Sequence, residues 1–120
     1  MTTSTSDRED LIRAEAQALG FDLCRFTDVE APWPAAGRLA EYVAAGRHGE
    51  MTWMAETLER RTHPRGMWPD ARCAIVLGMN YGPQGDPLAI LRRPEQGAIS
   101  VYAQGDDYHD VIKPRLKALG

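Results

Sequence analysis

The chain has 120 residues, of which 43% are hydrophobic, and a net charge of −3 at neutral pH. This length fits one small domain rather than two, and the acidic balance excludes a protein whose whole surface is a basic nucleic-acid clamp. The longest apolar run, residues 74–77, is far shorter than the roughly 20 residues of a membrane helix. The polar start, MTTSTSDRED, lacks the basic and apolar regions of a secretory signal, so we expect a cytoplasmic protein without membrane contact.

The first part of the chain predicts a helix followed by a strand. Residues 1–6 are rich in Ser and Thr and are expected to form a disordered N-terminus. Ser6 and Glu9 have the spacing of a capping box, which predicts a helix over residues 7–19. Alternating apolar and polar residues over 21–27 then predict a half-buried strand.

The middle of the chain predicts two helices, a loop and a strand. Pro34 suits the first turn of a helix that ends near Gly46, and a short helix follows over residues 51–58. Residues 60–70 contain two prolines and a glycine and are predicted to form an ordered loop. The continuous apolar run within 73–80 predicts a central strand that is covered on both faces.

The last part predicts a further strand over residues 97–103 and a helix that starts near Tyr108. The helix keeps apolar residues at helical spacing although Pro114 removes one backbone hydrogen bond. Helices and strands thus alternate irregularly along the chain. This order predicts the α/β class, as a small mixed α+β domain with central strands flanked by helices.

The sequence predicts no metal site. Cys24 and Cys73 are far apart and form no C-x-x-C pair, whereas a zinc or iron–sulfur site needs several closely spaced ligands. His48 and His63 lack ligand spacing as well. Each cysteine lies in an apolar segment, so both are expected to be buried, reduced thiols.

Four stretches of sequence carry a family signature when they are taken together. They are LGFD at 19–22, HGEMTWM at 48–54, RTHPR at 61–65 followed by PDAR at 69–72 and GMNY at 78–81, and GAISVYAQGDDYHD at 97–110. In this order and at these spacings they resemble the epoxyqueuosine reductases of queuosine-tRNA biosynthesis. The resemblance extends from about residue 9 to residue 120.

The resemblance implies an enzyme that reduces the epoxide of epoxyqueuosine in a tRNA anticodon to an alkene. Such enzymes use cobalamin and a pair of [4Fe–4S] clusters, and their N-terminal domain forms one wall of the cobalamin site. Residues 7–120 are expected to be that domain, truncated before the family's catalytic Asp and before the iron–sulfur domain. The cluster ligands would then lie outside this chain, and its expected partners are the tRNA and the missing iron–sulfur domain.

The resemblance also implies roles for five residues. Arg61, Ser100 and Tyr108 match cobalamin-binding positions, and Asp107 and His109 match a segment near the reacting face, where they are the candidate catalytic residues. Opening an epoxide requires a proton for the leaving oxygen. An imidazole can donate one near neutral pH, and a carboxylate two residues away can hold that imidazole.

Each of these residues also has a simpler interpretation. Asp107 can cap the last helix, and His109 can face solvent on it. Arg61 can form a surface ion pair with a neighbouring glutamate, and Ser100 can be an ordinary polar residue of a strand.

Two other functions remain open from the sequence. One is a non-catalytic corrinoid-binding or partner-docking module, which needs another chain to supply the clusters. The other is a flavin-type reductase domain that shares this topology, since a fold alone does not decide function.

Overall fold

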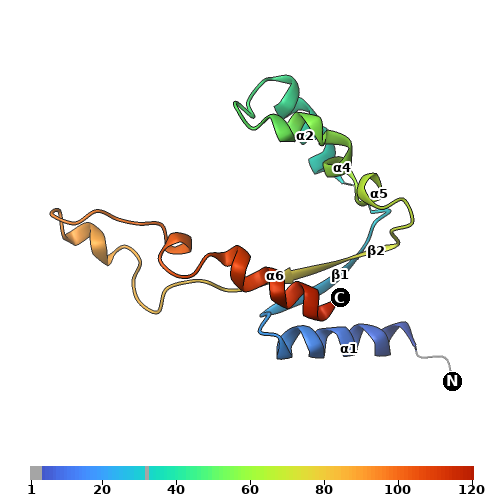
Figure 1. Cartoon of the computed structure of the whole chain (residues 1–120), viewed down its shortest axis with the longest axis horizontal. Helices are drawn as coiled ribbons and strands as arrows, with labels where there is room; N and C mark the ends of the chain where they lie inside the picture. Colours follow the sequence, from blue (N-terminus) through green and yellow to red (C-terminus); the bar gives the residue numbers. More distant parts are fainter. Residues whose placement is uncertain (1–3, 32) are drawn as a thin grey trace. The chain divides into compact units, whose positions relative to one another are not determined.

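The computed structural model describes residues 4–31 and 33–120 (Figure 1). In these residues the chain forms six α-helices, two β-strands and two short 3₁₀ helices, which confirms the expected small mixed α/β architecture. The residues divide into two compact units. The terminal unit comprises the chain up to Cys24 together with Leu77–Gly120, and the central unit comprises Arg25–Val76.

Helix α1, Thr5–Ala18, begins earlier than the sequence predicts. Its N-cap is Ser4, whose hydroxyl accepts a hydrogen bond from the Ser6 amide at 3.1 Å, while the Asp7 carboxylate accepts one from the Ser4 amide at 3.1 Å. The predicted capping box of Ser6 and Glu9 is therefore wrong by two residues. The expected disorder is wrong for the cap and first turn of the helix, and the three residues before the cap lie outside the described part.

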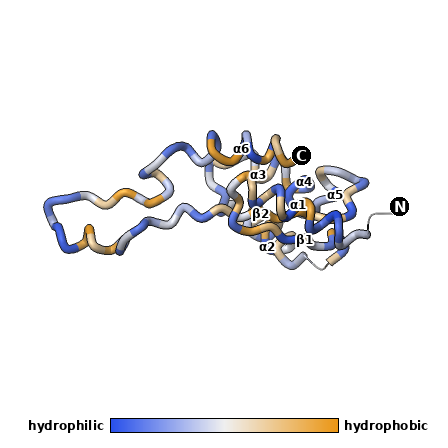
Figure 2. Tube along the Cα trace, turned by 90° about the horizontal axis from the view of Figure 1, so that it is seen from below, coloured by the Kyte–Doolittle hydropathy of each residue, from blue (hydrophilic) through white to orange (hydrophobic). Residues whose placement is uncertain are grey.

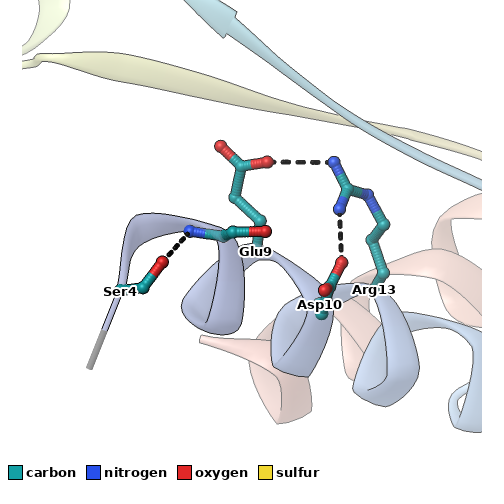
Figure 3. A network of polar contacts seen from close by, with 5 residues as sticks. Ser4, Glu9, Asp10 and Arg13 are labelled. Carbon is teal, nitrogen blue, oxygen red and sulfur yellow. Dashed lines mark hydrogen bonds and ion pairs between the residues drawn. The ribbon is translucent and has the colours of Figure 1, made fainter.

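Polar contacts continue along α1 (Figure 3). The Arg13 guanidinium bridges two carboxylates, Glu9 at 3.0 Å and Asp10 at 2.8 Å. Glu9 thus pairs along the helix instead of capping it. Such pairs, three and four residues apart on a helix surface, stabilise the helix by about 0.2–0.5 kcal/mol each.

The two strands form one antiparallel pair, β1 at Leu23–Asp28 and β2 at Cys73–Gly78. Asp22 continues the pairing beyond β1. Its amide donates to the Gly78 carbonyl at 2.9 Å, and its carboxylate accepts from the Asn80 amide at 2.7 Å. Asp22 thereby fixes the point where β2 ends and the following loop begins.

Strand β2 is not covered on both faces in the described structure, contrary to the prediction. Neighbouring residues of a strand point to opposite faces, and both Ile75 and Val76 are exposed, at 43% and 51%. The two cysteines also differ from each other in burial. Cys24 on β1 is buried as expected, whereas Cys73 on β2 is exposed, so the prediction of two buried thiols is wrong for Cys73.

The helices of the central unit are α2 at Pro34–Ala44, α3 at Thr52–Glu56, α4 at Leu58–Thr62 and α5 at Pro64–Met67. Helix α2 starts with Pro34 as predicted and packs against α4. The single helix expected over 51–58 is divided at Thr57. The loop expected over 60–70 is wrong, because Pro64 starts a helical turn there instead of breaking one.

Helix α5 is held by its own cap and by Arg65. The His63 ring accepts a hydrogen bond from the Arg65 amide at 3.1 Å through Nδ1. The Arg65 side chain donates to the Ala71 carbonyl at 3.1 Å and forms an ion pair with Glu30. Helices α4 and α5 also pack together directly, so the short helical turns of the central unit are tied by side chains as well as by backbone.

The terminal unit ends in helix α6, Tyr108–Leu119, which contacts α1. Figure 2 shows apolar and polar residues alternating along α6, as expected of an amphipathic helix. Pro114 lies inside α6 without ending it. The loop before α6 contains 3₁₀ helices at Ala89–Arg92 and Val101–Ala103. The strand predicted over 97–103 is therefore wrong.

The hydrophobic core of the described residues is small. Its buried members are Ala16, Phe21, Cys24, Val29 and Ala71. Across residues 4–31 and 33–120, no helix combines the length and apolarity that crossing a membrane requires.

Candidate functional site

A cavity of about 920 Å³ lies in the terminal unit. Its wall is formed by the residues that follow β2, by the 3₁₀ turn at 101–103 with the residues after it, and by the first turns of α6. The apolar and aromatic residues of the wall include Met79, Tyr81, Val101, Tyr102, Tyr108 and Val111, and its polar side chains are Asn80, Gln104 and Asp106. A mostly apolar wall with a few polar groups is typical of a site for a large organic ligand.

The N-terminus of α6 borders this cavity through Tyr108. Asp107 is the N-cap of the helix, and its Oδ1 accepts a hydrogen bond from the His109 amide at 2.8 Å. Asp is among the residues that best satisfy the free amides of a first helical turn. The interpretation of Asp107 as a helix cap is therefore confirmed.

The same oxygen of Asp107 also contacts the imidazole of His109, with 2.8 Å between Oδ1 and Nδ1. The backbone hydrogen bond from His109, followed by the one from its side chain, lowers the pKa of Asp107 below the ordinary value of 3.8. The carboxylate is thus charged at neutral pH. It acts there as an acceptor that orients the imidazole and has no proton of its own to give.

The contact with Asp107 leaves the other edge of the His109 ring available. With Nδ1 donating to the carboxylate, the neutral imidazole carries its lone pair on Nε2. The ring stacks on Tyr108, with 4.1 Å between the ring centroids and 28° between the planes. About half of the His109 side chain is exposed, at 52%. His109 is thus exposed on the helix, and it is held there by a carboxylate on one side and an aromatic ring on another.

Only one residue of the predicted Asp107–His109 segment lines the cavity. Tyr108 lines it, whereas Asp107 and His109 flank Tyr108 outside the lining. Ser100 does not line it either: the residue is exposed, and its carbonyl accepts from the Ala103 amide at 2.9 Å to start the 3₁₀ turn. The interpretation of Ser100 as a strand residue is wrong.

Several lining residues were missed from the sequence alone. Met79 and Tyr81 belong to the GMNY stretch, and Val101 and Tyr102 follow Ser100 in the GAISVYAQ stretch. The available signal was that two of the matching stretches contain a tyrosine, Tyr81 and Tyr102, and these side chains are 70% and 60% exposed. Large exposed aromatic side chains often mark a surface that binds something.

Arg61 belongs to the central unit, on α4. Its Nε donates a hydrogen bond to the Thr57 hydroxyl at 2.8 Å, and its guanidinium carbon lies 4.3 Å from the centroid of the Trp53 ring. Within the described residues, Arg61 makes no ion pair with Glu56 or Glu59. The surface ion pair considered from the sequence is therefore wrong, and a stacked, hydrogen-bonded arginine takes its place.

No metal-binding cluster occurs in the part of the chain that the structure describes. There, no group of three or more His, Cys, Asp or Glu side chains is placed to hold a metal ion.

Comparison with known proteins identifies related sequences. A family model described as epoxyqueuosine reductase QueG, DUF1730, matches residues 61–120. A curated protein named epoxyqueuosine reductase from Cellulophaga algicola is 38% identical over 110 residues, which are 92% of this chain and 34% of the relative. Relatives of the same name from Yersinia pestis and Pseudomonas aeruginosa are 39% and 37% identical, over 91% and 90% of this chain and 26% and 30% of their own lengths.

The chain thus spans about a third of the length of the curated relatives that it matches. No solved structure matches it.

Proposed function

Because the chain belongs to the epoxyqueuosine reductase QueG family, we propose that it forms the cobalamin-contacting part of a cytoplasmic epoxyqueuosine reductase. The reaction proposed for the whole enzyme is reduction of the epoxide of epoxyqueuosine in a tRNA anticodon to the alkene of queuosine. One observation carries the proposal. The cavity of the terminal unit is lined by Tyr108, at the centre of the D-Y-H segment, and is flanked by the Asp107–His109 pair.

The lining of the cavity supports a corrin as its ligand. A corrin combines broad, largely apolar faces with a rim of carboxamide groups. Tyr81, Tyr102 and Tyr108 offer flat apolar surfaces that end in hydroxyl groups. Asn80 and Gln104 offer amide groups that can exchange hydrogen bonds with carboxamides. Ser100, which precedes the lining residue Val101, remains a proposed further contact through its exposed hydroxyl.

In the proposed reaction, the D-Y-H segment would act as a proton donor. Releasing the epoxide oxygen as water takes two electrons and two protons, and cobalamin would supply redox chemistry that amino acid side chains lack. Asp107 would fix the His109 ring through Nδ1, and Nε2 of the charged ring would protonate the leaving oxygen. Asp107 itself would remain a carboxylate, because its hydrogen bonds lower its pKa.

The proposal places the remaining redox groups outside this chain. A [4Fe–4S] cluster is held by four cysteine thiolates, and the chain has two cysteines. The clusters, the family's catalytic Asp and much of the tRNA surface would belong to the two thirds of the relatives that this chain does not span. The chain alone is therefore proposed to bind cobalamin without completing the reaction.

The test is an anaerobic absorbance titration of the chain with cobalamin. We expect saturable binding with a base-off spectral shift, weakened severalfold by Tyr108→Ala. Tyr42→Ala is the matched control, because Tyr42 lies on α2 in the other unit and lines no part of the cavity. Absence of saturable binding by a chain whose circular dichroism shows it to be folded would overturn the proposal.

A further inference from the structure

A second cavity, of about 370 Å³, lies in the long segment between β2 and α6 of the terminal unit. Its volume is near the lower end of the range for small-molecule sites, about 300–1,000 Å³, so it suits a smaller ligand than the first cavity does. The apolar part of its wall comes from Pro83, Pro87, Ile90, Ile99 and Val101. The proposed function makes no use of this cavity.

The polar side chains of this wall are Asp86 and Gln104. Gln104 donates through Nε2 to the Ile99 carbonyl at 2.7 Å. Among the described residues its Oε1 has no donor, and this atom can only accept a hydrogen bond. Gly85 and Gly97 line the cavity as well, and an added Cβ at either would meet no atom within 4 Å, so the main chain there borders open space.

The Asp86 carboxylate has more acceptor sites than donors around it. Its Oδ1 accepts from the Leu88 amide at 2.9 Å, just before the 3₁₀ turn at Ala89–Arg92. Its Oδ2 lies 3.8 Å from Nη2 of Arg92, which is too long for a hydrogen bond, and such exposed pairs contribute little. A carboxylate offers about four acceptor sites, so most of those on Asp86 have no donor among the described residues.

The side chains of the cavity wall thus offer unused acceptors and apolar surface. A ligand that fits this wall must bring N–H groups and a largely apolar body. An alkyl ammonium brings N–H groups, but it is a strongly hydrated point charge, and it would lose its water against the apolar wall. A guanine ring is uncharged, has flat apolar faces and carries an imino and an amino N–H side by side on one edge, so one carboxylate can accept from both.

We propose that the second cavity binds a guanine-type heterocycle, whose adjacent N–H groups donate to the Asp86 carboxylate. Adenine and cytosine fit less well, because on the same edge a ring nitrogen that only accepts stands beside the amino group and would face the carboxylate. Two sources offer the guanine edge, a free nucleoside and an unpaired base of an RNA. The inference goes beyond the proposed function, because it concerns a different cavity and needs no cobalamin.

The first experiment titrates the chain with guanosine, inosine and adenosine and follows the backbone amides by two-dimensional NMR. We expect saturable shifts with guanosine, concentrated in the cavity wall at residues 83–104. Inosine lacks the amino group and should bind about tenfold more weakly, as expected when a hydrogen bond to a charged group is lost. Adenosine should bind more weakly still. Equal affinities for guanosine and adenosine, or no saturable shift with guanosine in a folded chain, would overturn the proposal.

Asp86→Asn tests the residue that carries the contact. Asparagine keeps the cap on the Leu88 amide, but it removes the charge and one acceptor oxygen, so the affinity for guanosine should fall about tenfold. If this variant does not fold, Asp86→Ser replaces it, because serine also caps and also lacks the charge.

Glu95→Gln is the matched control for Asp86→Asn. It removes the same charge from the same segment, and Glu95 is exposed and lines neither cavity. Its affinity for guanosine should stay within about twofold of the wild type, since an isolated exposed charge contributes little. Equal losses in the two variants would mean that net charge alone controls binding, and would overturn the contact with Asp86.

An RNA hairpin with one unpaired guanine in its loop identifies the source of the ring. If the base belongs to an RNA, this hairpin should bind at least about tenfold more tightly than guanosine, because its phosphates add contacts, and adenine at the same position should remove most of that affinity. If the ligand is a free nucleoside, the hairpin should bind no more tightly than guanosine. A hairpin that binds tightly and equally with either base would overturn the base site in favour of phosphate contacts. Since these titrations contain no cobalamin, their failure and that of the cobalamin titration are separate results.

Discussion

At the scale of single residues, Asp107 shows how one side chain serves a helix and a candidate site together. Its Oδ1 accepts a hydrogen bond from the backbone amide of His109 and another from the ring nitrogen of His109, each at 2.8 Å. The first bond satisfies a free amide of α6, and the second sets the direction of the imidazole. One oxygen of Asp107 therefore has both a structural role and a proposed catalytic role. A substitution of Asp107 can keep the helix cap and still remove the negative charge.

The pH dependence of α6 follows from the lowered pKa of Asp107. A carboxylate whose folded-state pKa lies below its unfolded-state pKa stabilises the fold fully above the unfolded value and stops doing so as the pH falls through the folded value. We expect protection of the His109 amide against hydrogen exchange to be constant from neutral pH down to about 4 and to decrease below that.

Asp107→Asn is the matched control for this pH dependence, because asparagine caps a helix as well as aspartate but does not titrate. The acid-dependent loss of protection at His109 should disappear in this variant. If the variant and the wild type lose protection at the same pH, another group controls the stability of α6.

At the scale of elements, the close approach of α4 and α5 depends on Gly66. A Cβ placed on Gly66 would overlap the Glu59 carbonyl oxygen, which is backbone and cannot rotate away. We therefore expect Gly66→Ala to lower the free energy of unfolding by about 1–3 kcal/mol, the usual cost of overpacking. Urea denaturation followed by circular dichroism measures the change.

Gly37→Ala is the control for this substitution. Gly37 lies within α2, and an added Cβ there meets no atom within 4 Å. Alanine is the better helix former by about 0.5–1 kcal/mol, so this variant should be more stable than the wild type. Destabilisation by both substitutions to a similar extent would mean that contact with Glu59 is not the cause.

The elements that the sequence predicted well are those whose signal is local. The apolar spacing of α1 and α6, the proline that starts α2, and the Asp107 cap can all be recognised within a few residues. The strand expected over 97–103 failed because a strand also needs a partner strand, and no strand pairs with this segment in the described structure. The loop expected over 60–70 failed because proline also starts helices.

The candidate site, like the helices and strands, could be predicted only where its residues lie close together in the sequence. The D-Y-H segment could be identified as one contiguous stretch. The lining by Met79 and Val101 could not, because these residues are brought together by the tertiary fold. The stacking of Arg61 on Trp53 could not be predicted either, since the break in the helix at Thr57 decides where the two side chains meet.

At the scale of the whole molecule, each unit contains only a few buried residues. Ala16, Phe21 and Cys24 are buried in the terminal unit, and Val29 and Ala71 in the central unit. None of the described residues has a large side chain that is buried completely. Because burial of apolar surface is the main favourable contribution to folding, we expect a free energy of unfolding near the low end of the usual range, about 5 kcal/mol.

Phe21 is the largest side chain of this core, at 5% exposure. Phe21→Ala should cost about 3–5 kcal/mol, which is comparable with the whole stability expected. If each unit is stabilised mainly by its own buried residues, the amides of α1 and α6 should lose protection against hydrogen exchange before those of α2 and α4 do. Val29→Ala, in the central unit, should reverse that order with a smaller total effect. If either variant lowered protection equally in both units, the chain would unfold as one cooperative body, and the two cores would have to be treated as one.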